Sequence, residues 1–545
     1  MTLEEQIGQV LMVGFQGDTP SQEIIALIQR HHIGNIILFS RNVRDAQQVL
    51  ELTQRLQRCA KEAGQPYPLL IAIDQENGIV QRLREAVTVF PGNMALGAIG
   101  SEQIAYEVAL AIGRELKALG INMNLAPVVD VNNNPANPVI GVRSFGEDAQ
   151  QVACLGAAMV RGYHDAGVYS CLKHFPGHGD TAVDSHLALP TISYGLERLE
   201  AVELVPFRSG IEAGADSVMI AHIAFPTLIE QERLPATLSS AIVQGLLREK
   251  LGFNGVILSD CLEMRAISDT FGTERAAVMA LQAGIDLVLV SHRYTRQRGS
   301  IEAIQAAVQA QELSPQVIQQ AAERVLRLKA SHLSWHDLPD ATTVSINIGC
   351  ESHLYLQKRA YELSTTLIRN EDALLPLHLN AGERIVLISL QRNTMTMVED
   401  RYYPDELLAE IIEQYHTPVS ILPVARDTTE ADWVKLLQTT RETDIFIVAT
   451  VNAHLDERQA ALVRYLLGSG RRVIGIALRN PYDLQAFPEL RTYLVTYEYT
   501  RQALVAAVRV LFGESQAQGK VPVSIPNHDL DEAPFTPSLL DLSND

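Results

Sequence analysis

Short apolar runs alternate with amphipathic stretches over residues 1–330. The apolar runs are rich in aliphatic and β-branched side chains, and polar or turn residues soon follow each of them. Nearly continuous apolar runs are typical of strands that are buried on both faces, as in parallel sheets. The predicted strands are Met12–Phe15, Asn35–Phe39, Leu69–Asp74, Met123–Val129, Tyr169–Phe175, Ser217–Ile223, Val256–Asp260 and Asp286–Val290.

Helical periodicity occupies the segments between these strands, as in Ser21–His31, Glu102–Leu119 and Glu274–Ala283. Eight strand-then-helix units in a chain segment of this length predict a (β/α)8, TIM-like barrel. An open, doubly wound sheet is the alternative architecture.

The alternation lapses around Lys329–Gly349 and then resumes. We therefore predict a catalytic barrel over residues 1–335, a polar linker over 336–350, and a smaller α/β sandwich domain over 351–545. The strands and helices expected in the second domain are Arg384–Leu390, Asp444–Thr450, Arg472–Leu478 and Tyr493–Tyr497, with Glu430–Thr439 and Glu457–Leu467 between them.

Composition narrows the class of protein. The chain has 545 residues, 47% of them hydrophobic, and a net charge of −20, which disfavours nucleic acid as a partner. Its five cysteines are scattered and never spaced as CxxC, so no disulfide framework or zinc cluster is indicated. The first residues are acidic and no apolar run is long enough for a bilayer, so we expect a cytoplasmic protein without a membrane span.

Charged and imidazole side chains collect where the predicted barrel strands end. Barrel enzymes keep their catalytic groups at the carboxyl ends of strands and in the loops that follow. Strand ends are often polar for solvation alone, but such groups on four strands of one rim favour a ligand site. These residues are Asp74, Lys173, His174, His222 and Asp260.

The segment Lys173–His186 holds three histidines, two aspartates and a lysine within fourteen residues. Side chains two apart share a face of an extended backbone, which would bring Asp184 beside His186. A carboxylate next to an imidazole fixes its tautomer and favours its charged form. This arrangement would prepare His186 to donate a proton and later to take one back.

Other readings of this loop remain open. A zinc site would use histidines and aspartate, although HExxH and paired cysteines are absent from the sequence. A serine esterase would need a Gly-x-Ser-x-Gly elbow, which is also absent. A purely structural hydrogen-bonded loop is the third reading, and His178 taken alone is better explained as organising the loop.

Asp260 closes an apolar strand, where a carboxylate is costly unless a positive charge opposes it. Lys173, Arg143 or a cationic transition state could supply that charge. The alternative is that Asp260 caps a helix beginning near Leu262.

Several strings in residues 1–330 resemble glycoside hydrolase family 3, in its bacterial β-N-acetylglucosaminidase branch. They are Asp74-Gln-Glu, Phe90-Pro-Gly-Asn-Met-Ala-Leu-Gly, Asn124-Leu-Ala-Pro-Val-Val-Asp, Ile140-Gly-Val-Arg-Ser-Phe-Gly, Lys173-His-Phe-Pro-Gly-His-Gly, Asp184-Ser-His and Met219-Ile-Ala-His. The tail resembles the C-terminal α/β domain of the same family through Asn480-Pro-Tyr-Asp-Leu, Leu511-Phe-Gly-Glu and Gly519-Lys-Val-Pro-Val-Ser-Ile-Pro.

The resemblance implies a retaining β-N-acetylhexosaminidase that removes terminal non-reducing β-linked N-acetylglucosamine. Asp260 would be the nucleophile, and His186 the general acid/base, oriented by Asp184. The residues implied in holding the sugar ring are Asp74, Arg82, Arg143, Lys173 and His174, and we group His222 with them. Muropeptide fragments or chitooligosaccharides are the expected substrates, and neither a metal nor an organic cofactor is expected.

The resemblance leaves two rivals. Retaining glycosidases usually employ two carboxyl groups, whereas an imidazole takes the place of the acid here. Because neutral imidazole repels anions less than a carboxylate does, a phosphorylase that releases sugar 1-phosphate is one alternative. A non-catalytic amino-sugar-binding protein is the other.

The sequence departs from the family pattern at three places. Asn77 replaces a glycine, which Asn tolerates because it accepts positive φ better than most residues. Ile79 replaces an arginine, which puts contacts near the sugar pocket in doubt. Cys261 replaces a second aspartate and leaves Asp260 untouched. We assign the C-terminal domain no catalytic residue.

Overall fold

A computed structural model describes residues 1–182, 188–229, 233–380, 382–390, 399, 406–424 and 428–526 of the chain. The barrel half contains every strand predicted for it, all in parallel pairings. The strands are β1 (Leu11–Val13), β2 (Asn35–Leu38), β3 (Leu70–Ile73), β6 (Met123–Asn124), β7 (Cys171–Phe175), β8 (Ser217–Ile220), β9 (Val256–Ser259) and β10 (Val288–Val290).

These strands form two sheets, in the orders β10-β1-β2-β3-β6 and β7-β8-β9. Two isolated parallel bridges, Met123–Tyr169 and Leu258–Leu287, join the sheets at both edges. The strand order therefore runs around a TIM-like barrel rather than along an open sheet, although the ladder is interrupted at two places. The fold predicted for this half is confirmed.

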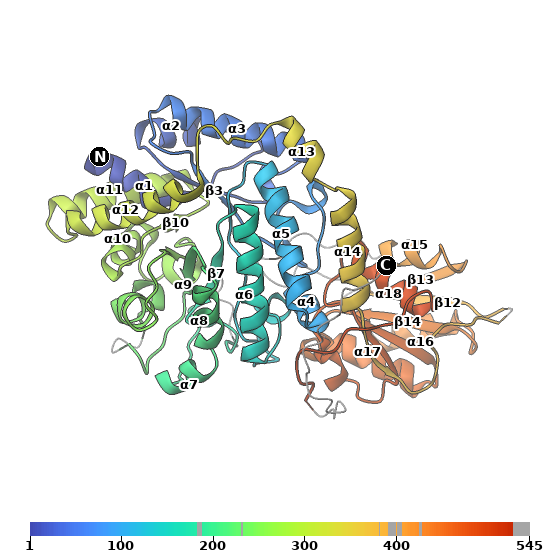
Figure 1. Ribbon diagram of the computed structural model, residues 1–545. Coiled ribbons are helices and arrows are strands. Elements are labelled where there is room, and N and C mark those ends of the chain that lie inside the picture. The colour runs from blue at the N-terminus through green and yellow to red at the C-terminus, as the bar shows by residue number, and fades with distance from the viewer. Residues whose placement is uncertain are drawn as a thin grey trace.

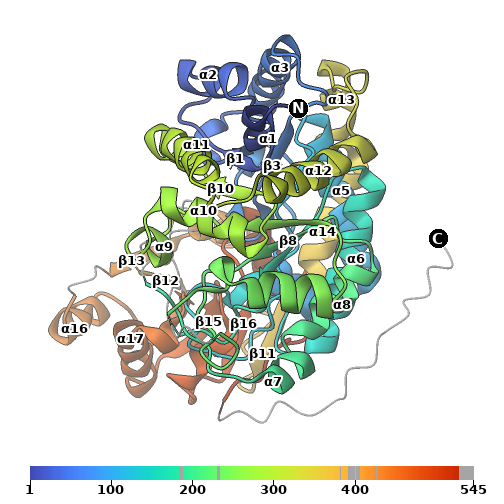
Figure 2. The same ribbon diagram turned by 90° about the vertical axis from the view of Figure 1, so that its left-hand side faces the viewer.

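Helices surround the strands on the outside (Figures 1 and 2). They are α1 (Leu3–Gln9), α2 (Gln22–Arg30), α3 (Ala46–Glu62), α4 (Asn93–Ile99), α5 (Glu102–Ala118), α6 (Ala149–Ala166), α7 (Leu196–Ala201), α8 (Leu204–Glu212), η5 (Ala241–Lys250), α9 (Arg265–Ser268), α10 (Thr273–Ala283), α11 (Tyr294–Gln309) and α12 (Pro315–His332). Within the described ranges, no helix combines the length and apolar composition that a bilayer crossing requires.

Local sequence signals fix where these helices begin and end. The side chains of Asp45, Ser101 and Asp148 each accept a hydrogen bond from the backbone N–H three residues on, which satisfies an otherwise unpaired donor of the first turn. Gly167 and Gly284 end α6 and α10 in the left-handed conformation, which glycine adopts without a steric penalty.

The C-terminal domain is a mixed six-stranded sheet in the order β11-β16-β15-β14-β12-β13. Only β11 runs antiparallel, to β16. The strands are β11 (Thr366–Asn370), β12 (Ile385–Leu390), β13 (Val419–Val424), β14 (Ile445–Thr450), β15 (Arg472–Ala477) and β16 (Thr492–Val495). The helices are α15 (Glu406–Ile412), α16 (Glu430–Gln438), α17 (Glu457–Gly468) and α18 (Arg501–Leu511), with short turns η6 (Ala453–Leu455) and η7 (Pro481–Gln485).

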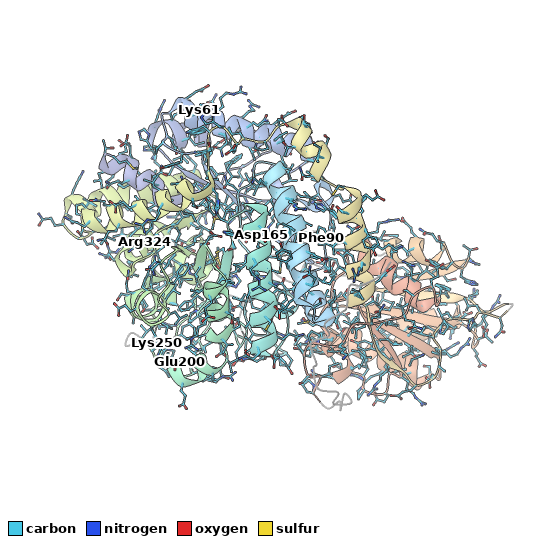
Figure 3. All side chains as sticks on the ribbon, in the orientation of Figure 1. Lys61, Phe90, Asp165, Glu200, Lys250 and Arg324 are labelled. Carbon is cyan, nitrogen blue, oxygen red and sulfur yellow. The ribbon has the colours of Figure 1, made fainter. Side chains whose placement is uncertain are left out.

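The segment between the barrel and the C-terminal sheet contains helices, although a polar linker was predicted for part of it. Helix α13 (Ala341–Asn347) occupies part of the predicted 336–350 linker, and α14 (Glu351–Ser364) runs from the barrel to the second domain (Figure 1). On the barrel side, Phe90, labelled in Figure 3, is fully buried. Its ring meets the ring of His353 edge-on. His353 Nδ1 also pairs with the buried carboxylate of Glu115 at 2.7 Å, so α14 is anchored to the barrel by both apolar and polar contacts.

Candidate active site

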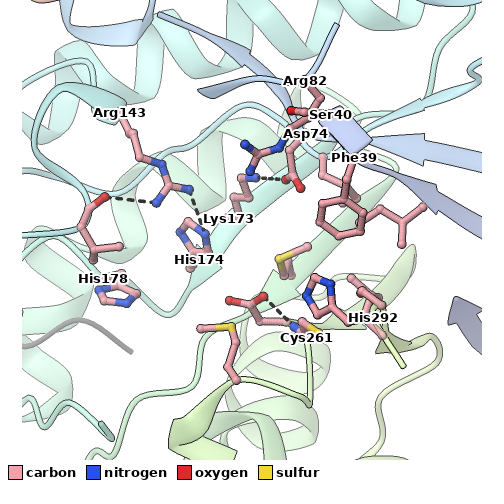
Figure 4. A pocket seen from close by; sticks show the side chains of 18 of the residues that line it. Phe39, Ser40, Asp74, Arg82, Arg143, Lys173, His174, His178, Cys261 and His292 are labelled. Carbon is pink, nitrogen blue, oxygen red and sulfur yellow. Dashed lines mark hydrogen bonds and ion pairs between the residues drawn. The ribbon is translucent and has the colours of Figure 1, made fainter. Parts of the chain in front are cut away.

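A cavity of about 340 Å³ opens at the carboxyl ends of the barrel strands, a volume in the range of small-molecule sites. Asp74 follows β3, Lys173 and His174 belong to the end of β7, and Asp260 follows β9. Figure 4 shows the side chains that converge on this cavity. Its lining residues are Ile37, Phe39, Ser40, Arg41, Asp74, Arg82, Leu125, Val139, Arg143, Lys173, His174, His178, Met219, Asp260, Cys261, Met264, Leu289, Ser291 and His292.

One wall of the cavity is built on a hairpin that directly follows Asp74. Its strands are β4 (Gln75–Asn77) and β5 (Val80–Gln81). The hairpin turns where Asn77 and Gly78 have φ values of 67° and 60°, a backbone region that asparagine and glycine accept more readily than other residues. The turn brings Arg82, eight residues after Asp74, back to the same cavity.

Glu76, on β4, is a buried carboxylate that holds two of the predicted sugar-binding cations. Arg143 Nε and Nη2 donate to its two oxygens at 2.8 Å each, and Lys173 Nζ lies 2.7 Å from Oε1. Burial alone would raise the pKa of Glu76, but the charges of Arg143 and Lys173 outweigh it and hold that pKa well below its usual range. Glu76 is therefore ionised, and its negative charge fixes both cations.

Lys173 bridges two carboxylates. Its ammonium group donates to Asp74 Oδ1 at 2.7 Å in addition to its contact with Glu76. Burial opposes the charge on Lys173, yet Asp74 and Glu76 together raise the pKa of the ammonium group above its ordinary value. Asp74 is the more exposed member, with 17% of its side chain accessible, so its carboxylate can accept hydrogen bonds from a ligand.

His174 is held in one tautomer by Asp130. The ring Nδ1 lies 2.7 Å from Asp130 Oδ2, and the backbone N–H of His174 donates to the same carboxylate at 3.2 Å. Because a carboxylate only accepts, Nδ1 carries the hydrogen. Burial would raise the pKa of Asp130, but His174 lowers it below the ordinary value. Nε2 then faces Arg143 Nη2, 3.5 Å away.

These contacts form one continuous row in which all members but the partly exposed Asp74 are buried: Asp130, His174, Arg143, Glu76, Lys173 and Asp74. The carboxylates of the row, from Asp130, Glu76 and Asp74, face its His174, Arg143 and Lys173 side chains, so the cost of burying the charges is offset. Each side chain is fixed before a ligand arrives. Such a row presents pre-oriented donors and acceptors, which suits a sugar ring with several hydroxyl groups.

Asp260 reaches the same cavity from β9. Its backbone N–H donates to Ile220 O at 3.2 Å, which fixes the residue to β8, and its Oδ1 accepts the N–H of Cys261 at 2.6 Å. Helix α9 begins at Arg265 with Met264 as its N-cap, so Asp260 is not the helix cap that the alternative reading required. A carboxylate fixed at the wall of a cavity that also holds oriented cations is suited to attack a carbon that develops positive charge.

His222 contacts the segment next to Asp260 and is not among the residues that line the cavity. It is fully buried, with Nδ1 2.7 Å from Thr237 Oγ1 and Nε2 3.0 Å from the carbonyl oxygen of Cys261. The carbonyl can only accept, so Nε2 donates to it. The contact steadies the backbone next to Asp260.

The cavity has a second wall of different character. His292 and Phe39 lie with ring centroids 5.1 Å apart, and the guanidinium carbon of Arg41 stands 4.1 Å from the centroid of the Phe39 ring. In Figure 4 these rings lie across the cavity from His174 and Arg143. Arg41 itself is held by the backbone, with Nε donating to Phe15 O at 2.9 Å and Nη2 to Ser291 O at 2.8 Å.

The structure brings the predicted sugar-binding residues Asp74, Arg82, Arg143, Lys173 and His174 to the same cavity as Asp260. Asp184 and His186 lie outside the described residues. Ile79 does not line the cavity: it is 4% exposed and packs in the hydrophobic core of the C-terminal domain. Ile79 therefore makes contacts at the junction between the two domains, and not near the sugar pocket as expected from the sequence.

Two members of the row, Glu76 and Asp130, were not predicted as site residues from the sequence. Asp130 comes directly after the predicted strand Met123–Val129, so the signal that singled out Asp74 and Asp260 was present there as well. Glu76 stands two residues after Asp74 on a segment without apolar periodicity, and its only signal was this proximity.

Comparisons with known proteins cover both halves of the chain. Residues 2–328 match the glycosyl hydrolase family 3 N terminal domain, and residues 365–541 match the glycosyl hydrolase family 3 C-terminal domain. Beta-hexosaminidase A of Pseudoalteromonas piscicida is 32% identical over 97% of this chain and 98% of its own length.

Two solved structures share the whole arrangement. A family 3 β-N-acetylglucosaminidase from Paenibacillus sp. str. FPU-7 is 41% identical, with a TM-score of 0.89 over 96% of this chain and 99% of that one. A fungal multi-domain β-N-acetylglucosaminidase is 42% identical, with a TM-score of 0.92 over 98% of this chain, and the present chain spans 62% of its length.

Proposed function

Because this chain belongs to glycosyl hydrolase family 3, we propose that it removes terminal non-reducing β-linked N-acetylglucosamine from oligosaccharides with retention of configuration. The observation that carries the proposal is the meeting of the Asp260 carboxylate and the buried row in a single cavity. Relatives of high coverage, a beta-hexosaminidase and a β-N-acetylglucosaminidase, support this choice of sugar. Muropeptide fragments and chitooligosaccharides are the proposed substrates.

In the proposed first step, the Asp260 carboxylate attacks the anomeric carbon while the bond to the leaving-group oxygen breaks. His186 would give its proton to that oxygen, and Asp184 would orient the imidazole. In the second step water attacks the same carbon, returns a proton to His186 and releases Asp260. The row from Asp130 to Asp74 would bind the sugar hydroxyls throughout.

Two described histidines on the side of the cavity that carries the row, His174 and His178, are poorly suited to the acid role, which supports leaving it to His186. His174 is engaged between Asp130 and Arg143. Burial lowers the pKa of His178 to about 4, so its imidazole is neutral near pH 7 and would be a poor proton donor. A more solvated imidazole paired with a carboxylate would titrate nearer neutrality.

The test is turnover of 4-nitrophenyl β-N-acetylglucosaminide by the full chain and by Asp260→Asn and His186→Gln. We expect rapid release of nitrophenol by the parent and a loss of at least 1,000-fold in the Asp260 variant, on the order of the rate lost when a catalytic nucleophile is removed. Near-normal turnover by Asp260→Asn would contradict the assignment. Product analysis with added phosphate separates the alternatives, because sugar 1-phosphate as the main product would identify a phosphorylase.

A further inference from the structure

The C-terminal domain packs against the hairpin that carries Glu76. Ile79 and Val80, at the turn and second strand of this hairpin, are buried in the hydrophobic core of that domain rather than in the core of the barrel. Val142, next to Arg143, belongs to the same core. The two barrel segments that supply Glu76 and Arg143 are therefore packed from outside the barrel.

Glu498, which follows β16, makes polar contacts between the C-terminal domain and this part of the barrel. It is 1% exposed, and its Oε2 accepts the backbone N–H of Gly92, at the start of α4, at 2.8 Å. Its Oε1 accepts the hydroxyls of Tyr361, on α14, and Thr500 at 2.7 Å each. A β-carbon on Gly78 would stand 2.9 Å from Glu498 Oε2, so the carboxylate lies directly against the turn of the hairpin.

A second set of contacts holds the loop that leads to Arg143. Asn132 Nδ2 donates to the hydroxyl of Tyr482 at 3.0 Å, and His454 Nε2 donates to Pro135 O at 3.2 Å. Asp483 Oδ1 lies 2.9 Å from Nδ1 of His454 and orients that ring. Tyr482, His454 and Asp483 all belong to the C-terminal domain, and Tyr482 is 1% exposed.

These two segments meet at the wall of the cavity, which Arg143 lines. Glu76 comes from the hairpin and Arg143 from the loop, and their two parallel hydrogen bonds of 2.8 Å join the segments. Such a paired contact tolerates little relative displacement, because both bonds depend on the angle between guanidinium and carboxylate. A shift of either segment at the domain junction would alter this pair.

We propose that Glu498 and Tyr482 are positioning residues for the sugar site, and that the C-terminal domain thereby forms a structural part of it. They act through the Glu76–Arg143 pair and do not themselves line the cavity. The inference concerns the positions of the sugar-binding side chains. It rests on the proposed function only in the choice of assay.

The experiment compares Glu498→Gln and Tyr482→Phe with Tyr415→Phe. Tyr415 is a matched control, since it is also in the C-terminal domain and its hydroxyl also makes a single hydrogen bond, to Glu514 at 2.9 Å, away from the junction. KM and kcat for the nitrophenyl substrate and the inhibition constant of N-acetylglucosamine are measured for each. We expect KM and the inhibition constant to rise at least fivefold in both junction variants and to change less than twofold in the control.

A double variant separates positioning from simple loss of stability. If Tyr482 acts through the Glu76–Arg143 pair, Tyr482→Phe should weaken N-acetylglucosamine binding markedly in the parent and by less than twofold when Glu76 is already Gln. Unchanged KM in folded junction variants, or fully additive losses in the double variant, would overturn the inference. Failure of the proposed function would look different: the unmodified chain would release no nitrophenol, and calorimetric binding of N-acetylglucosamine would then supply the same comparison.

Discussion

Replacing Glu76 by Gln tests whether the buried row stabilises the barrel as the contacts imply. The substitution keeps the size of the side chain, so it opens no cavity. It removes the negative charge that faces Arg143 and Lys173, whose side chains are only 5% and 2% exposed. Removing one partner of a buried ion pair costs about 3–5 kcal/mol, because the remaining charge is left uncompensated. Two cations share Glu76, so we expect the upper part of that range.

The pH dependence gives an independent check on the same carboxylate. The folded pKa of Glu76 lies below its ordinary value of 4.5, so its contribution is complete above that pH and is lost as the pH falls below it. The free energy of unfolding of the parent should therefore decline more steeply below about pH 4.5 than that of the Gln variant.

The assay is urea unfolding followed by fluorescence and circular dichroism at several pH values. Glu85→Gln is the control, because Glu85 is an exposed glutamate a few residues further along the same segment. An unfolding free energy for Glu76→Gln within about 1 kcal/mol of the parent would refute the reasoning, since a surface charge change has an effect of that size or less.

Three further predictions follow from single contacts. Asp130→Asn removes the charged acceptor of His174 Nδ1, a bond of about 1.5–3 kcal/mol, and should lower kcat/KM for the nitrophenyl substrate about 10- to 100-fold; an unchanged value would contradict the tautomer assignment. Lys329 is fully buried, its ammonium group donates to Gln9 Oε1 and to the carbonyl oxygen of Gly34, and burial lowers its pKa to about 7. Because the unfolded chain binds this proton up to about pH 10, stability should rise by roughly 4 kcal/mol more from pH 7 to 10 in the parent than in Lys329→Met, and parallel urea-unfolding curves would count against it. Burial raises the pKa of the Cys261 thiol to about 11, so iodoacetamide at pH 7 should leave turnover intact, and fast inactivation that Cys261→Ser abolishes would show the thiolate to be accessible.

The strands of the barrel could be predicted because they are buried on both faces and carry their own apolar signal. Their ends were less well defined: Met123–Val129 was predicted, whereas β6 ends at Asn124, and Pro127 further on has no N–H for a sheet ladder. The edge strands β11 and β13 were missed because their side chains are partly exposed, and because β13 contains Pro423, a residue type that argues against a strand.

The charged ends of β3, β7 and β9 were found because the barrel topology places all of them on one rim. The contributions of the C-terminal domain could not be found in this way. The residues around Glu498 and Tyr482 show a pattern that predicts burial or a turn. The sequence pattern does not show which residues of the barrel these two side chains contact. Ile79 illustrates the same limit, since its partners lie hundreds of residues further along the chain.

The interdependence of the six-membered row bears on how this scaffold could be adapted to other sugars. Every member of the row is engaged with its neighbour, so a single exchange there disturbs several groups together and costs folding energy before it alters selectivity. The wall formed by Phe39, Arg41 and His292 is held mostly by backbone carbonyls and ring contacts. Libraries aimed at other sugars should therefore diversify that wall first and keep the row unchanged.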